Sequence, residues 1–325
     1  MQNAAATTTT PTGIHHLTAI AGDPQTNVDF YTGLLGLRLI KKTVNFDDPT
    51  AYHLYYGDAT GSPGSIVTFF YWPGHEARGR LGSGQNTAIV FSVPADSLDF
   101  WQQRLTAAGV AATRRERFGE TVLALADPDG IPVELVAVDH DDRAGWTTPD
   151  ISAEHALRGL HTAELTVRSP LKTEALITDV MGYQLRRRDG ARARFESAAG
   201  GGSGHYIDVI ADDTARPGVG GAGTIHHIAW SVPDDATELA MQARLARAGH
   251  LVSDVRDRNY FHSIYYREPG GILFEIATET PGFAIDESPD TLGSALKLPA
   301  QFESARPQIE SILPPIHAIN TNQTG

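Results

Sequence analysis

Two pairs of adjacent histidines are the residues of this sequence best suited to chemistry. His15 and His16 stand near the start of the chain, and His226 and His227 recur in a matching stretch far downstream. Imidazole is the commonest metal ligand among protein side chains. Both stretches have the composition of short β-strands, in which successive side chains point to opposite faces. We therefore expect each pair to supply one metal ligand, and the wider sequence must decide which histidine that is.

Glu275 is the acidic residue that fits with these histidines. It stands inside the apolar run 272–276, where a buried carboxylate is costly unless it is paired or bound to a metal. Two imidazoles and one carboxylate form the ligand set of non-haem Fe(II) enzymes, and this set leaves positions open for O2 and a substrate. If one histidine of each pair joins Glu275, the sequence predicts such a site.

Four copies of one unit must position these residues. Each copy begins with a strand, continues with an amphipathic helix that a glycine ends, and closes with three strands, so that its order is βαβββ. The predicted helices span residues 27–35, 97–108, 171–181 and 236–248. The predicted strands span residues 13–21, 37–46, 51–56 and 65–71 in the first copy, 87–93, 111–118, 121–126 and 131–138 in the second, 160–167, 183–188, 193–196 and 205–210 in the third, and 225–232, 251–256, 262–267 and 272–277 in the fourth.

The four copies predict an α+β fold with two βαβββ modules in each of two domains. The expected divisions are a flexible leader at 1–12, a first domain at 13–139, a linker at 140–159, a second domain at 160–280, and a tail at 281–325 that packs over the core and contains a short helix near 308–312.

Aligning the copies indicates which of them can offer a ligand. The residues at the first-strand position are His16, Ala88, Thr162 and His227, and those at the last-strand position are Thr68, Glu134, Asp208 and Glu275. Pairing copies one and four gives His16, His227 and Glu275, pairing one and two gives His16 and Glu134, and pairing three and four gives His227, Glu275 and Asp208. Because the first pairing completes two histidines and one carboxylate, we predict that copy one closes against copy four. His15 and His226 then face away from the metal unless a strand bulges.

Other histidines and glutamates of the repeats receive a structural interpretation. A lone strand histidine is more often a structural residue than a ligand, and Glu134 lacks a histidine partner, so we expect hydrogen bonds or an arginine to satisfy it. The histidines that we treat as structural are His53, His161, His205 and His250.

Composition excludes several classes of function. The 325 residues carry a formal net charge of −13, which disfavours nucleic acids and anionic membranes as partners. The absence of cysteine excludes disulfides, zinc–thiolate sites and cysteine nucleophiles. The first twelve residues lack the features of a secretory signal, and no apolar run approaches the length of a membrane span. We expect a cytoplasmic protein.

The motifs of the chain resemble those of the vicinal oxygen chelate superfamily, which includes glyoxalase I, extradiol dioxygenases and bleomycin-resistance proteins. Within it, residues from about 13 to about 303 are most similar to the hydroquinone ring-cleaving dioxygenases, such as 2,6-dichlorohydroquinone 1,2-dioxygenase. The matching stretches are 15–18, 52–55, 225–227, 258–261, 265–275, 282–283 and 292–298. His262 and Tyr266 depart from the pattern, where Arg and Phe are expected, and we expect these changes to affect the fit of the substrate.

This resemblance implies two glyoxalase/extradiol-dioxygenase-like domains and a ring-cleaving dioxygenase that uses Fe(II), or alternatively Mn(II), with O2 and a small aromatic substrate. It implies His16, His227 and Glu275 as metal ligands and leaves a homo-oligomer open. The residues that it places beside the ligands are His15, Thr18, His226, Arg258 and Tyr265. We expect Arg258 to stabilise phenolate charge, Tyr265 and His226 to donate hydrogen bonds or relay protons, and Phe261 and Tyr266 to line the aromatic ring.

Two other functions use the same fold. A glyoxalase-like isomerase or lyase would want a fourth protein ligand, but the first copy offers no carboxylate on its last strand. A non-catalytic binding protein of the bleomycin-resistance type would need no histidine pair. The single carboxylate beside two histidines therefore favours the dioxygenase over both alternatives.

Overall fold

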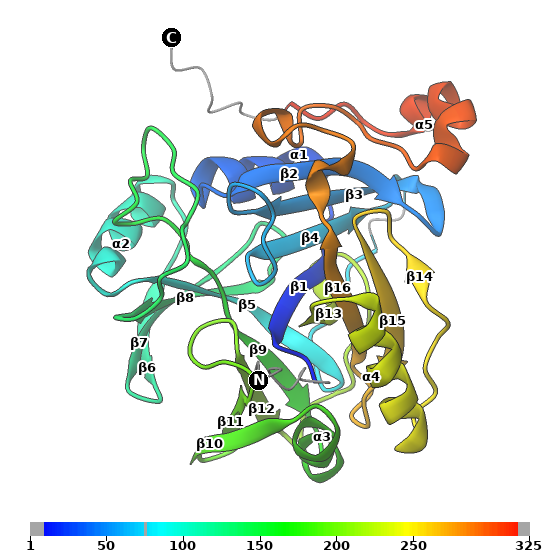
Figure 1. The fold of residues 1–325 in the computed structure, drawn as a ribbon. Helices are drawn as coiled ribbons and strands as arrows, with labels where there is room; N and C mark the ends of the chain where they lie inside the picture. The colour runs from blue at the N-terminus through cyan, green and yellow to red at the C-terminus, as the bar shows by residue number, and fades with distance from the viewer. Residues whose placement is uncertain (1–9, 75–76, 318–325) are drawn as a thin grey trace, which may run out of the picture.

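Two curled eight-stranded sheets make up the body of the computed structural model, which describes residues 10–74 and 77–317 (Figure 1). The first sheet has the order β14-β15-β16-β13-β1-β4-β3-β2, and the second has the order β10-β11-β12-β9-β5-β8-β7-β6. Each sheet therefore combines two βαβββ modules. The α+β fold of four modules predicted from the sequence is confirmed.

The strands closely follow the predicted segments. In the first sheet they are β1 (Gly13–Ile20), β2 (Arg38–Asn45), β3 (Asp48–Gly57), β4 (Ile66–Tyr71), β13 (Thr224–Val232), β14 (Arg256–Asp257), β15 (Phe261–Arg267) and β16 (Leu273–Pro281). In the second sheet they are β5 (Gln85–Pro94), β6 (Thr113–Arg117), β7 (Glu120–Ala126), β8 (Pro132–Val138), β9 (Gly159–Val167), β10 (Tyr183–Asp189), β11 (Arg192–Ser197) and β12 (Tyr206–Ala211).

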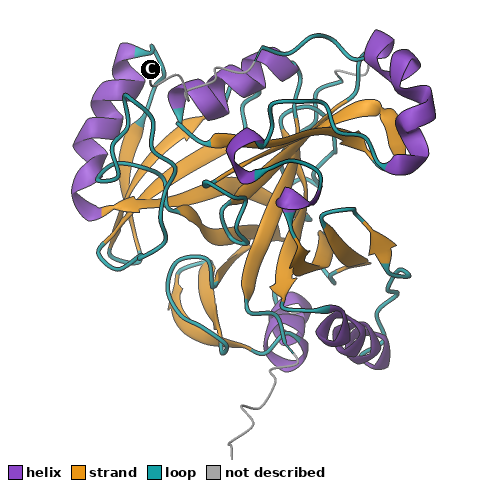
Figure 2. Ribbon diagram, turned by 45° about the horizontal axis from the view of Figure 1, so that its top comes forward, coloured by secondary structure: helices purple, strands orange, loops and turns teal. Residues whose placement is uncertain are grey.

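The helices lie at the periphery of the molecule, outside the strands (Figure 2). They are α1 (Pro24–Val28), α2 (Leu98–Ala107), α3 (Leu171–Ala175), α4 (Asp235–Arg247) and α5 (Arg306–Ile312), and π-helical turns at Asp29–Leu34 and Leu176–Val180 extend α1 and α3. The side chain of Asp23 caps α1, so this helix begins earlier than predicted. The glycines predicted to end the four module helices all adopt a left-handed φ, between +71° and +89°: Gly36, Gly109, Gly182 and Gly249.

The pairing of the first strands joins the two ends of the repeat. Strand β1 pairs antiparallel with β13, which closes module one against module four, as predicted. Strand β5 pairs antiparallel with β9, which closes module two against module three. The two halves of the chain, 13–139 and 160–280, are therefore interleaved, because each sheet takes one module from each half.

One predicted strand is mostly absent. Residues 251–256 were expected to form the second strand of module four, but only Arg256 pairs regularly there, within β14. Leu251 is 95% exposed, and Ser253 and Asp254 follow it, so the segment has no apolar face to bury. Val252 keeps a single bridge to Tyr266.

The tail packs along module one, as expected. The side chain of Lys41 is fully buried, and its Nζ lies 2.6 Å from Asp286 and 2.5 Å from Glu287 of the tail. The predicted short helix is present as α5. Of the predicted leader, residues 1–9 lie outside the described residues, whereas the backbone N–H of Thr12 donates to Ser231 of β13. Within 10–74 and 77–317, the helices are too short or too polar to span a bilayer.

Candidate metal centre and active site

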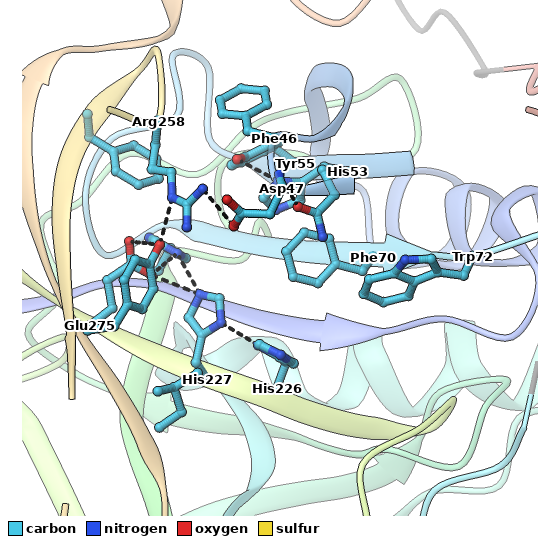
Figure 3. A pocket seen from close by; sticks show the side chains of 15 residues that line it. Phe46, Asp47, His53, Tyr55, Phe70, Trp72, His226, His227, Arg258 and Glu275 are labelled. Carbon is cyan, nitrogen blue, oxygen red and sulfur yellow. Dashed lines mark hydrogen bonds and ion pairs between the residues drawn. The ribbon is translucent and has the colours of Figure 1, made fainter. Parts of the chain in front are cut away.

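Three predicted ligands converge inside the first sheet, and two of them, His227 and Glu275, are labelled in Figure 3. His16 comes from β1, His227 from β13 and Glu275 from β16, and all three side chains are buried. The Nε2 atom of His227 lies 2.9 Å from Glu275 Oε2, and the Nε2 atom of His16 lies 3.4 Å from the same oxygen. The two Nε2 atoms are 3.4 Å apart. The structure therefore brings together the three residues that the repeat alignment selected.

The donor atoms of this cluster fit a metal ion. Two ligands that bind an ion at about 2.1 Å and at right angles lie about 3 Å apart, which is close to the separations found here. Glu275 Oε2 is buried, and within the described part of the chain it has no hydrogen-bond donor of suitable geometry. Burial opposes the ionisation of Glu275, but the two imidazoles outweigh it and hold its pKa well below the usual range. A buried, ionised carboxylate is costly unless a cation faces it, and at this position the cation can be a protonated imidazole or a metal ion.

His15 determines which nitrogen of His16 is free. Its Nδ1 lies 2.9 Å from Nδ1 of His16, and its Nε2 lies 3.1 Å from the carbonyl oxygen of Thr278. Burial, together with the charge of His16, lowers the pKa of His15 to about 3, so His15 is neutral. Because the Thr278 carbonyl only accepts, His15 carries its proton on Nε2 and accepts from His16 at Nδ1. Nε2 of His16 is then left with a lone pair that faces the other two ligands.

The second histidine pair repeats this contact. Nδ1 of His226 lies 2.8 Å from Nδ1 of His227. Strand register shifts at both pairs: His15 lies opposite no residue of β13, and His226 opposite no residue of β1. These irregularities turn each outer ring toward its neighbour, which simple alternation along a strand would not do. His15 and His226 therefore contact the predicted ligands from the side away from the cluster.

A chain of polar contacts holds the other oxygen of Glu275. The hydroxyl of Tyr265 donates to Glu275 Oε1 over 2.9 Å and accepts from Nε of Arg258 over 3.0 Å. Burial, and then the charge of Glu275, raises the pKa of Tyr265, so this residue stays a neutral donor. Nη1 of Arg258 continues to Asp47, at 2.9 Å, on the connection between β2 and β3. Oε2 of Glu275 is thereby oriented toward the histidines.

A cavity of about 310 Å³ opens above the three ligands. Its wall away from the ligands is aromatic, as Figure 3 shows, and a positive group, Arg258, stands at its edge. This wall contains Phe46, Tyr55, Phe70 and Trp72, whereas Tyr265 and Phe261 line the cavity beside the predicted ligands. The prediction that Phe261 lines the cavity is confirmed. A flat apolar ring matches such a wall, and its oxygen substituents match the polar floor.

Two expectations about the substrate cavity are wrong. Tyr266 does not line it, because this residue is buried in the core and its hydroxyl points to Met181 at 3.7 Å. His262 also lies outside it, where its Nδ1 contacts Asp235 of α4 at 2.8 Å. Side chains alternate along β15, and that of Tyr266 faces the core whereas that of Tyr265 faces the predicted ligands. The sequence alone did not show which of the two faces belongs to the core. Neither departure from the family pattern touches the cavity.

His53 is a cavity residue that the sequence interpretation treated as structural. It lines the cavity with both ring nitrogens occupied: Nδ1 lies 2.9 Å from the hydroxyl of Tyr55, and Nε2 lies 2.8 Å from Oγ1 of Thr68. The Thr68 hydroxyl in turn donates to Thr18 over 2.8 Å. Thr18, which was predicted beside the ligands, is fully buried on β1. The run Tyr52-His-Leu-Tyr55 is the sequence signal that pointed to this position.

In the second sheet, arginines contact the carboxylates that are equivalent to Glu275 of the first sheet. Glu134 and Asp208 lie at the register of Glu275 on their strands, as the alignment predicted. Nη1 of Arg117 contacts Glu134 at 2.5 Å, and Nε of Arg194 contacts Asp208 at 2.7 Å. The expectation that an arginine satisfies Glu134 is therefore confirmed.

Comparison with known proteins identifies the chain's relatives. Residues 13–135 and 159–276 match the model of the Glyoxalase/Bleomycin resistance protein/Dioxygenase superfamily. The chain is 46% identical over 303 residues to the "Putative ring-cleaving dioxygenase MhqO" of Bacillus subtilis (strain 168), covering 93% of this chain and 96% of the relative. It is 36% identical over 306 residues to the chlorohydroquinone/hydroquinone 1,2-dioxygenase of Sphingobium indicum, covering 91% and 94%.

A solved structure agrees over the whole described fold. The crystal structure of a "putative dioxygenase" from Bacillus subtilis subsp. subtilis str. 168 superposes with a TM-score of 0.91 at 45% identity. The superposition covers 95% of this chain and 98% of the other. These similarities confirm the resemblance on which the sequence prediction drew.

Proposed function

This chain belongs to the glyoxalase/bleomycin resistance protein/dioxygenase superfamily, and from that premise we propose that it is a metal-dependent ring-cleaving dioxygenase acting on a hydroquinone-type ring. The observation that carries the proposal is the buried cluster of His16, His227 and Glu275 at the floor of an aromatic cavity. The relatives named as ring-cleaving dioxygenases at 36–46% identity support it.

The position of Thr68 favours a dioxygenase over an isomerase. Thr68 occupies the register on β4 that Glu275 occupies on β16. Its hydroxyl is engaged with His53 and Thr18. An isomerase of this fold would want a fourth protein ligand, and at this register module one offers a hydroxyl that is already bonded. A three-ligand site leaves positions open for O2 and substrate.

The metal that we propose is Fe(II), with Mn(II) as the alternative, held by His16, His227 and Glu275. Such an ion would supply the Lewis-acid and redox chemistry that the reaction of a phenol with O2 requires.

The surrounding residues bind and orient the substrate. The guanidinium of Arg258 faces the cavity and stabilises a deprotonated phenol oxygen by charge. If Nε2 of His227 holds the metal, its proton is on Nδ1 and is donated to Nδ1 of His226, 2.8 Å away. Neutral His226 then carries its own proton on Nε2, as a hydrogen-bond donor beside the proposed ligands. Tyr265 keeps Glu275 oriented, and the aromatic wall holds the ring flat and excludes water.

The overall reaction changes the charge of the molecule in the cavity. Both atoms of O2 enter the product, the ring C–C bond next to the hydroxyl-bearing carbon breaks, and no other atom is gained or lost. The hydroxyl-bearing carbon becomes a carboxylic acid and its neighbour an aldehyde. A hydroquinone, which is neutral near pH 7, therefore leaves as a carboxylate anion.

Oxygen uptake tests this function. Protein loaded anaerobically with Fe(II) is expected to consume O2 with hydroquinone, in step with the loss of the aromatic ring. His227→Ala is expected to bind less iron and to show only background uptake. His262→Ala is the matched control, because His262 lies outside the cavity, and it should keep full uptake. Activity retained in His227→Ala would disprove the assignment, as would turnover with Ni(II) or Zn(II) that consumes no O2.

A further inference from the structure

A second cavity borders the His226–His227 pair and so reaches one predicted ligand, His227. Its volume is about 500 Å³, within the usual range of small-molecule sites. It shares three lining residues with the aromatic cavity: His226, His227 and Leu273. The rest of its wall comes from the end of β1, from the segments that lead into β5 and β13 and the starts of these strands, and from the β15–β16 turn. Strands β5 and β13 lie next to each other in the middle of the molecule, where the two sheets meet (Figure 1).

The two cavities differ in chemistry. The first is aromatic and includes the carboxylates of Asp47 and Glu275. Among the described residues that line the second, none is an aspartate or glutamate, and none is a phenylalanine, tyrosine or tryptophan. Its charged side chain is that of Arg267, whose Nη1 donates to the carbonyl of Gly271 over 2.8 Å. In a chain with a formal net charge of −13, a cavity with an arginine and no carboxylate selects anions.

A buried amide adds an unused donor to this wall. Asn86 lines the second cavity and is 1% exposed. Its Oδ1 accepts from the backbone N–H of Ala88, which assigns the other atom as Nδ2. Within 10–74 and 77–317, that Nδ2 has no acceptor. A buried donor without a partner costs about 1–3 kcal/mol, which an anionic or carbonyl oxygen would recover.

We propose that this second cavity is the exit route for the ring-opened carboxylate product, which Arg267 and Asn86 attract past His226. The proposal rests on the proposed function, since it takes the product to be a flexible anion formed from a flat neutral ring. The aromatic cavity suits the substrate, and the second cavity suits the product. A reaction that converts a flat neutral substrate into a flexible anionic product benefits from two openings whose lining residues differ in chemistry.

Gly220 allows this route to be blocked without disturbing the fold. It lines the second cavity, a Cβ built on it meets no atom within 4 Å, and its φ lies outside the left-handed region. The other lining glycines do not offer this. A Cβ on Gly218 would lie 2.2 Å from Gln85, and Gly84 and Gly271 have φ values of +82° and +103°. Val219, which is 47% exposed and lies outside the lining, provides a neighbouring control.

Binding to the metal-free protein tests the anion site directly. Calorimetry with cis,cis-muconate, a linear six-carbon dicarboxylate, is expected to show binding to the wild type. The loss of a charge-assisted hydrogen bond should weaken that binding roughly tenfold in Arg267→Gln. Gly220→Phe should abolish it, whereas Arg247→Gln, which removes an exposed charge from α4, should leave it unchanged. No binding to the wild type, or equal binding to all variants, would overturn the proposal.

Transient kinetics of the iron-loaded enzyme tests whether the second cavity serves product release and not substrate entry. In Gly220→Phe, ring opening in a single turnover should keep its rate, while steady-state turnover falls roughly tenfold because product release becomes limiting. Val219→Phe should match the wild type in both measurements. An equal decline in both rates, an unchanged steady state, or slower substrate binding would reject an exit route. If the wild type opens no ring, the proposed function fails, and muconate binding alone then decides whether the cavity is an anion site.

Discussion

His53 fixes the direction of a chain of hydrogen bonds beside the ligands. Tyr55 donates to its Nδ1, so its Nε2 donates to Thr68, and Thr68 donates to Thr18. Burial, and then the charge of His16, lowers the pKa of His53 well below its usual range, so it stays neutral. Because Thr18 accepts the last hydrogen bond of this chain, its own hydroxyl hydrogen remains available as a donor inside the first sheet.

Two substitutions of His53 should separate this positioning role from packing. His53→Gln keeps an acceptor for Tyr55 and a donor for Thr68, and kcat for O2 uptake should stay within about threefold of the wild type. His53→Phe removes both, and kcat should fall about tenfold, since a lost hydrogen bond in a buried site costs about 1–3 kcal/mol. Iron content, measured in parallel, should be unchanged in both variants. Equal activity in the two variants would contradict this role.

Residue-level prediction succeeded where the repeat supplied a second copy for comparison. His16 and His227 were selected because they occupy the same position in two modules, and Glu275 because it stands at the last-strand position of module four, which pairs with module one. His53 has hydrogen-bond partners on β3 and β4, reaches β1 only through Thr68, and has no histidine counterpart in the other modules. Pairwise contacts of that kind depend on strand order, which a single sequence does not reveal. For the same reason, the sequence did not predict the β-bulges at the two histidine pairs.

Strands β11 and β12 carry a charged cluster that replaces a metal site with ion pairs. Asp208 is fully buried and contacts two arginines, with its Oδ1 2.7 Å from Nε of Arg194 and its Oδ2 3.3 Å from Nη1 of Arg192. Breaking a buried ion pair leaves an uncompensated charge, which costs about 3–5 kcal/mol. Asp208 of the second sheet is therefore stabilised by ion pairs. We propose that the equivalent carboxylate of the first sheet, Glu275, is stabilised by the bound metal ion.

Substituting the two equivalent carboxylates should have opposite results. Asp208→Asn should lower the free energy of unfolding by about 3–5 kcal/mol in urea and leave iron affinity unchanged. Glu275→Gln should lose iron affinity, while the free energy of unfolding of the metal-free protein falls far less. Both quantities should be measured on each variant. A loss of iron affinity in Asp208→Asn, with the fold intact, would show that the two sheets do not divide these roles.

The prediction of secondary structure failed at one predicted strand, where the burial of side chains and not their periodicity decides the conformation. The four module helices were predicted from apolar residues at helical spacing and a glycine at the end of each, and all four glycines adopt the left-handed conformation. The strand at 251–256 was expected only because the other modules have one there. Its Leu251 stays in solvent, and the chain reaches β15 by an irregular path. The repeat thus predicts the number of elements more reliably than it predicts their regularity.

At the scale of the whole molecule, one buried acid should make stability depend on pH. Glu238 on α4 is 1% exposed, and in the described chain neither of its carboxylate oxygens has a hydrogen-bond partner. Burial raises its pKa from 4.5 to about 7, although His262 opposes the shift. The folded protein therefore holds a proton that the unfolded chain releases above pH 4.5. Glu238 should thus lower the free energy of unfolding as the pH rises from 4.5 to about 7.

Glu238→Gln should remove this dependence. At pH 8 the variant is expected to be more stable than the wild type by about 3 kcal/mol, at about 1.4 kcal/mol for each unit of pKa shift. Well below pH 4.5 the two should be equally stable, because Glu238 is then neutral in both the folded and the unfolded chain. Urea unfolding at several pH values gives the difference between the two proteins, in which the other titrating groups cancel. A constant difference across this range would contradict the shift.

The pairing of β1 with β13 also has a consequence for how the protein is made. His227 follows His16 by 211 residues, and Glu275 is later still. At translation rates of about 5–20 residues per second, roughly 10 to 40 seconds pass between the synthesis of the first two ligands. During that interval the edge of β1 that faces β13 has no partner strand, although β4 can already pair with the other edge, and a nascent chain exposes one histidine pair alone. The proposed metal site can therefore be completed only after Glu275 has left the ribosome.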